Sequence, residues 1–167
     1  LFDMDNDGYK DIYVCNGIYN DLTNQDFVDF FANEFMQKMV VTGKKEEIQT
    51  IISKMPSTLI PNYAFKNNKN LTFSNEAIKW GLDTPSFSNG AAYGDLDNDG
   101  DLDLIVNNVN MESFVYRNNS EKNKKNHYVK VKLKGDNQNK FAVGNVVELF
   151  SGKEILRQEL IHSRGFQ

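Results

Sequence analysis

Hydrophobic and polar residues alternate along several short stretches of the chain, and this period of two predicts β-strands. Asn, Asp, Gly and Ser bound these stretches, and these residues favour turns. Six strands are expected in the first part of the chain, at residues 11–16, 63–66, 71–74, 91–94, 103–108 and 113–117. The pattern predicts a mainly β fold.

Residues 20–60 follow the longer period of helices. One expected helical face carries large apolar residues, namely Phe27, Phe30, Phe31, Phe35 and Met39. Thr23-Asn24-Gln25-Asp26 precedes them and resembles a helix cap. A second apolar stripe covers Ile48, Ile51, Ile52 and Met55, and Pro56 stops it. We expect a helical hairpin inserted into a β repeat, where it packs on the body or serves as a partner or ligand lid.

The chain after residue 119 has a different character. Residues 120–126 are polar and predict a linker, whose lysines are expected to be solvated rather than to bind nucleic acid. Residues 127–167 alternate again, with strands expected at 128–134, 146–150 and 155–161 and a turn at Ser151-Gly152. This pattern predicts a second, small β domain at 127–167 that is cut off at Gln167, after a first domain at 1–119.

Two segments of the chain repeat each other. Residues 3–14 align with residues 95–106, and Phe65-Lys66-Asn67-Asn68 aligns with Tyr116-Arg117-Asn118-Asn119. The two elements lie 62 residues apart in the first copy and 21 in the second, an excess of 41 that the helical insertion explains. Without the insertion the repeat has about 51 residues, close to the length of one four-stranded propeller blade.

Acidic residues concentrate in the repeated segments. Nine of the 23 Asp and Glu lie in residues 3–11 and 95–103, and the rest of the chain carries 14 acidic residues against 18 Lys and Arg. This distribution favours local cation sites over a uniformly acidic surface. Two divalent ions would cancel the net charge of −4. Cys15 is the only cysteine and His127 and His162 are the only histidines, which argues against zinc and iron.

Carboxylates at alternate positions suit calcium, which takes six to eight oxygen ligands. The loop at 3–11 offers the side chains of Asp3, Asp5, Asp7 and Asp11 and the carbonyl of Tyr9. The loop at 95–103 offers the side chains of Asp95, Asp97, Asp99 and Asp103 and the carbonyl of Asp101. Two calcium ions are therefore expected. Magnesium is the weaker candidate because it keeps more waters, and an exposed turn without metal is the alternative.

The backbone of these loops is expected to turn sharply. Gly8 and Gly100 stand where a positive φ is predicted, and Asn6 and Asn98 suit the turn before them. The start of each loop resembles an EF-hand, but its twelfth position is Val14 or Val106 instead of the Glu that an EF-hand needs. A β run follows each loop where an EF-hand has a helix. The sequence thus argues against an EF-hand calcium sensor.

The segment Gly90-Ala91-Ala92-Tyr93-Gly94 followed by residues 95–104 resembles the FG-GAP/VCBS repeat of integrin-type β-propellers. The resemblance covers about residues 1–18 and 62–119, and implies about two blades of a partial propeller with calcium held between strands. Residues 127–167 resemble the start of an ASPIC/UnbV domain, through Asn126-His127-Tyr128-Val129-Lys130-Val131, Ala142-Val143-Gly144 and Ser163-Arg164-Gly165-Phe166-Gln167. That domain follows such repeats in secreted and bacterial cell-surface proteins related to cartilage acidic protein.

These features favour a non-catalytic, extracellular scaffold for adhesion or for binding a protein or glycan. The alternative is a polysaccharide-acting enzyme or an accessory module on a calcium-stabilised propeller. No apolar run is long enough for a transmembrane segment. The chain starts inside a motif without a signal peptide, so we interpret it as a fragment of a secreted or cell-surface protein.

Overall fold

The computed structural model describes residues 1–21, 23–43, 48–123 and 128–161. His127 and His162 lie outside these residues, as do most of the predicted linker and both ends of the segment that resembles ASPIC/UnbV.

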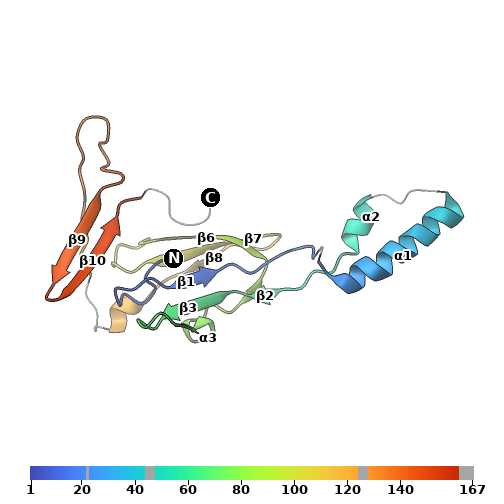
Figure 1. Ribbon diagram of the computed structural model, residues 1–167, viewed down its shortest axis with the longest axis horizontal. Coiled ribbons are helices and arrows are strands. Elements are labelled where there is room, and N and C mark those ends of the chain that lie inside the picture. Colours follow the sequence, from blue (N-terminus) through green and yellow to red (C-terminus); the bar gives the residue numbers. More distant parts are fainter. Residues whose placement is uncertain (22, 44–47, 124–127, 162–167) are drawn as a thin grey trace.

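Two three-stranded antiparallel sheets form the body of the molecule (Figure 1). The first sheet has the order β1-β3-β4, with strands at Ile12–Val14, Tyr63–Asn67 and Phe73–Asn75. The second has the order β6-β7-β8, with strands at Ser88–Gly94, Asp103–Asn108 and Phe114–Tyr116. All six strands predicted for this part of the chain are present, which confirms the mainly β fold.

The two sheets pair their strands in the same register. Ile12 pairs with Phe65 in the first sheet, as Leu104 pairs with Tyr116 in the second. The isolated bridge between Phe2 and Asp11 likewise corresponds to the pair of Gly94 and Asp103. The repeat in the sequence is therefore a repeat in three dimensions.

The core lies where these two copies meet. In β7 the side chains of Leu104 and Val106 are buried while Ile105 between them is exposed, as expected for a strand with one face inward. Phe2 stacks on Tyr93 of β6, with ring centroids 4.5 Å apart. The start of the first copy thus packs directly on the second copy.

Several short elements had no signal in the sequence. They are β2 (Ile60–Pro61), β5 (Pro85–Ser86), α3 (Ala77–Trp80) and the 3₁₀ helix η1 (Ser120–Asn123). None is long enough to show a period. A buried polar network follows β2, in which Asn62 Nδ2 donates to Ser88 Oγ of β6 (2.8 Å) and Ser88 Oγ donates to Asn108 Oδ1 of β7 (2.8 Å). The network joins residues of both copies.

Two helices lie in the stretch where helices were predicted, α1 (Gln25–Thr42) and α2 (Ile48–Ser53). Asn24 caps α1 by accepting the N–H of Phe27 (2.8 Å), and Gly43 ends it in the left-handed conformation. The helices project from the sheets as an arm (Figure 1), and Phe27 and Phe31 pack on each other. The alternative in which the stripe packs on the body is therefore wrong.

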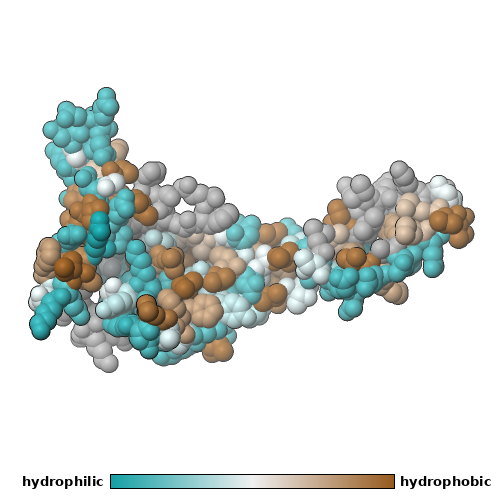
Figure 2. All heavy atoms as spheres, viewed as in Figure 1, coloured by the Kyte–Doolittle hydropathy of each residue, from teal (hydrophilic) through white to brown (hydrophobic). Residues whose placement is uncertain are grey.

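The two ends of this arm meet at the body, because Asp21 N–H donates to the carbonyl of Pro56 (3.2 Å). Hydrophobic side chains are exposed along the arm, with Val40 and Val41 at 86% and 83% exposure (Figure 2). No described helix is long and apolar enough to cross a bilayer.

Within residues 128–161 the chain forms one hairpin, β9 (Val146–Ser151) with β10 (Glu154–Glu159), at the end of the molecule opposite the helices (Figure 1). The strand predicted at 128–134 is wrong: that segment pairs with no described strand, and Val129 and Val131 are exposed. Alternation alone does not make a strand where no partner edge is available.

Candidate metal centre

Loop 1, residues 3–11, gathers three carboxylates. One oxygen from each of Asp3, Asp5 and Asp7 lies within 4.8 Å of the others. Asp3 curls the loop, because its two oxygens accept the N–H groups of Asp7 (3.0 Å) and Gly8 (2.8 Å). The curl makes these alternate side chains converge.

Loop 2, residues 95–103, gathers Asp95, Asp97 and Asp99 within the same distance. The N–H of Asp99 donates to Asp97 (3.3 Å), and that of Asp101 donates to Asp99 (3.1 Å). Both loops thus bring together positions one, three and five of the motif.

The predicted backbone conformations of both loops are confirmed. Gly8 and Gly100 have φ of 89° and 96°, and Asn6 and Asn98 have φ of 55° and 64°. Positive φ costs glycine and asparagine less than other residues. These four residues explain why the chain turns at the same place in each loop.

The ninth position of each loop holds a buried aspartate with a different role. Asp103 Oδ2 accepts the N–H of Leu96 (2.9 Å), and its Oδ1 accepts the N–H of Asn118 (2.8 Å). Asp11 does the same with the N–H groups of Met4 (2.9 Å) and Asn67 (2.9 Å). The structure places both outside the three-carboxylate clusters, where they tie the loop to the adjacent strand.

The recurring aromatic-basic-Asn-Asn element also ties each loop to its sheet, and together with the ninth-position aspartate it forms what we call the brace of the loop. Asn67 Nδ2 donates to the carbonyl of Lys10 (3.2 Å), as Asn118 Nδ2 donates to that of Leu102 (3.2 Å). Asn118 also donates to the carbonyl of Met4 (2.8 Å), and so joins loop 2 to loop 1. Sequence reasoning found this repeated element but did not assign it a role.

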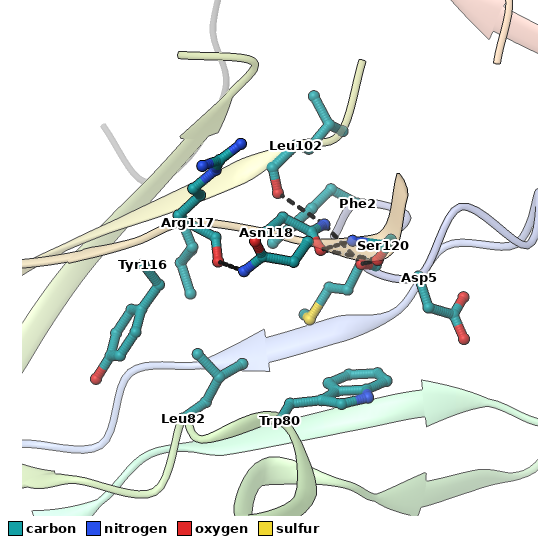
Figure 3. Close-up of a pocket in the computed structure, with 12 residues that line it drawn as sticks. Phe2, Asp5, Trp80, Leu82, Leu102, Tyr116, Arg117, Asn118 and Ser120 are labelled. Carbon is teal, nitrogen blue, oxygen red and sulfur yellow. Dashed lines mark hydrogen bonds between the residues drawn. The ribbon is translucent and has the colours of Figure 1, made fainter. Parts of the chain in front are cut away.

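Asn118 lies at the edge of a cavity of about 290 Å³ between the two copies (Figure 3). Trp80 and Leu82 face it from below, and Phe2 and Leu102 contribute further apolar surface. Ser120 adds a hydrogen bond to the carbonyl of Met4 (3.2 Å) at the rim. The cavity therefore has apolar walls and a polar edge, where Asn118 and Ser120 form hydrogen bonds with the loop backbones.

The seventh position differs between the loops. Tyr9 is 40% exposed, whereas Asp101 is fully buried and accepts hydrogen bonds from Asn6 and from the N–H of Glu121. Asp99, Asp101 and Glu121 form a third carboxylate cluster. Burial, followed by the hydrogen bond with Asp101, raises the pKa of Glu121. Glu121 has no counterpart in the first copy, so the repeat gave no sign of it.

Basic side chains contact both loops. Lys66 Nζ contacts Asp5 and lies 3.0 Å from Asp7, and Lys69 lies 3.5 Å from Asp7. At loop 2, Arg117 Nε lies 2.8 Å from Asp97, and Lys130 Nζ lies 2.9 Å from Asp95. These groups offset part of the repulsion between the carboxylates.

The two loops differ in how readily their carboxylates ionise. Burial raises the pKa of Asp3, although the N–H groups of Gly8 and Asp7 oppose the shift. In loop 2, the hydrogen bond from Lys130 lowers the pKa of Asp95, and that from the N–H of Asp101 lowers the pKa of Asp99. The first-position aspartates of the two loops, Asp3 and Asp95, therefore have pKa values shifted in opposite directions.

The donor set of both loops fits a hard divalent cation. Every ligand that the clusters offer is an oxygen, which favours calcium or magnesium over zinc. Asp95 Oδ1 is buried and has no hydrogen-bond partner among the described residues. Such an oxygen is costly to bury unless something binds it, and a cation would satisfy it.

A comparison with family models matches a part of the chain that contains loop 2. Residues 51–106 match the FG-GAP-like repeat. The FG-GAP-like repeat thus runs from α2 to β7 and includes loop 2, which supports the predicted FG-GAP/VCBS resemblance. Loop 1 and residues 127–167 lie outside the match, so their resemblance stays a prediction. No curated protein and no solved structure matched the chain.

Proposed function

We propose that this chain is a calcium-binding, non-catalytic β module of a secreted or cell-surface protein. Its two sheets belong to blades of a partial propeller that serves adhesion or binds a protein or glycan ligand. The FG-GAP-like repeat supports the proposed secreted or cell-surface location, because such repeats are typical of extracellular proteins.

One observation carries the proposal: two separate loops bring the same three motif positions within 4.8 Å of one another. Two unit charges 4 Å apart repel by about 4 kcal/mol at an effective dielectric of 20. A divalent ion would convert this repulsion into attraction.

In loop 1 the ion would bind Asp3, Asp5 and Asp7, with the carbonyl of Tyr9 as a further ligand. Asp11 accepts two backbone N–H groups, so it would reach the ion only through its remaining lone pairs.

Loop 2 would use Asp95, Asp97, Asp99 and the carbonyl of Asp101 in the same way. Asp103 stands where Asp11 does. In both loops the ion's role would be to hold a turn against the start of a strand, which is structural.

Isothermal titration with calcium tests the proposal. We expect two ions per chain, and one ion for either Asp5→Asn or Asp97→Asn, with Asp136→Asn as an exposed control that keeps both. Calcium at a hundred times its Kd should add about 2.7 kcal/mol to the free energy of unfolding per site. The absence of both binding heat and a rise in Tm at millimolar calcium would refute the proposal.

A further inference from the structure

A basic side chain stands at the same position in both copies of the repeat. Lys66 and Arg117 are the second residues of the aromatic-basic-Asn-Asn elements, and each directly precedes the asparagine whose N–H binds the ninth-position aspartate. The backbone at each basic residue is therefore fixed relative to its loop.

Both basic groups contact the third and fifth positions of their loop. Lys66 Nζ contacts Asp5 and lies 3.0 Å from Asp7 Oδ2. Arg117 places Nε 2.8 Å from Asp97 and Nη2 3.2 Å from Asp99. A lysine and an arginine of different length thus reach equivalent pairs of carboxylates.

A divalent ion in either loop needs the same oxygens. A cationic side chain and a calcium ion repel each other, so they bind these oxygens in competition. We propose, on the basis of the proposed function, that Lys66 and Arg117 are built-in competitors of calcium. They hold the carboxylates together when calcium is scarce and set the calcium concentration at which each loop fills.

The two competitors differ in strength. The Lys66 side chain is 27% exposed, whereas that of Arg117 is 59% exposed. Ion pairs lose strength as water reaches them. Lys66 therefore suppresses binding at loop 1 more strongly than Arg117 does at loop 2.

Calcium titration of single loops tests this inference. Lys66→Met is measured in an Asp97→Asn background, where only loop 1 binds, and Arg117→Met in an Asp5→Asn background. Methionine keeps the unbranched stem and removes the charge. The controls are Lys79→Met and Arg157→Met, which remove one charge each from pairs with Glu76 and Glu148 outside the loops.

We expect Lys66→Met to lower the calcium Kd of loop 1 about tenfold and Arg117→Met to lower that of loop 2 about threefold. The controls should change Kd less than twofold. In EDTA, both loop variants should have a lower Tm than their backgrounds, because the carboxylates lose their counter-charge. Lys66→Arg, which keeps the charge, should bind calcium as the background does.

A calcium Kd that is unchanged or higher in Lys66→Met would overturn the inference. If Lys66→Met does not fold in EDTA, Lys66→Gln is titrated instead, with the same expected direction and the same refuting result. A failure of the proposed function is distinguishable from a failure of this inference, because the unaltered chain would then bind no calcium at either loop.

Discussion

At the scale of single residues, the ninth-position aspartates hold the loops to the sheets. Asp103 is 2% exposed, and each of its oxygens accepts a backbone N–H from a different segment. Sequence spacing alone treats it as one more acidic ligand. Its burial and its two partners make it a brace whether or not a metal binds.

Asp103→Ala is therefore expected to lower the free energy of unfolding by about 3 kcal/mol, because it leaves two backbone donors without a partner. Urea unfolding in EDTA, followed by the fluorescence of Trp80, measures this loss without any metal effect. Asp97→Ala is the control, since that side chain is 37% exposed and should change stability by about 0.5 kcal/mol or less. Equal effects of the two variants would contradict the brace.

Gly17 is a second residue whose role only the packing reveals. A Cβ at this position would overlap the backbone of Phe87 and Ser88, which has little room to move. We expect Gly17→Ala to destabilise the fold by about 2 kcal/mol or more. Gly90→Ala is the matched control, because its Cβ would meet nothing within 4 Å. Thermal unfolding that shows both variants alike would disprove the close approach.

At the scale of elements, the two loops are copies with different electrostatic surroundings. The pKa of Asp3 is raised by burial, whereas those of Asp95 and Asp99 are lowered by hydrogen bonds. Calcium binds only the ionised carboxylate. As the pH falls, Asp3 is therefore expected to take up a proton before Asp95 and Asp99 do.

Loop 1 is therefore expected to lose calcium at a higher pH than loop 2. Titrations between pH 7 and pH 4.5, with Asp97→Asn reporting loop 1 and Asp5→Asn reporting loop 2, measure the two profiles. Profiles that coincide, or a loop 2 that weakens first, would show that the surroundings do not control protonation in this way.

At the scale of the whole molecule, the helical arm is separable from the sheets. Its ends meet through the hydrogen bond between Asp21 and Pro56, and the helices project away from the body (Figure 1). A short turn of Gly and Ser in place of residues 22–55 should therefore leave the sheets intact. We expect two bound calcium ions and a Tm within a few degrees of that of the full chain.

Calorimetry and calcium titration of the shortened chain check this expectation. Asp103→Ala should lower the stability of the shortened chain as much as it lowers that of the full chain. An equal loss would show that the hydrogen bonds of Asp103 are intact without the arm. A shortened chain that does not unfold cooperatively would show that the arm supports the sheets.

The sequence by itself determined the six strands of the two three-stranded sheets, the helical insertion and the turn conformations of the loops. These features depend on local periods and on residues such as Gly8 and Asn98 that favour a positive φ. The repeat also made the equivalence of the two loops visible. Short elements such as β2 and α3 were not predicted, because they contain too few residues to show a period.

The tertiary structure decided which acidic residues lie close together. Asp11 and Asp103 follow the alternating pattern, yet each accepts a backbone N–H from a distant segment and lies outside the three-carboxylate clusters. Glu121 joins Asp99 and Asp101 only because η1 folds back onto loop 2. The alternation at 128–134 produced no strand, because pairing requires a partner edge that the local sequence does not contain. Contacts between residues distant in the chain depend on the whole fold, so no local pattern predicts them.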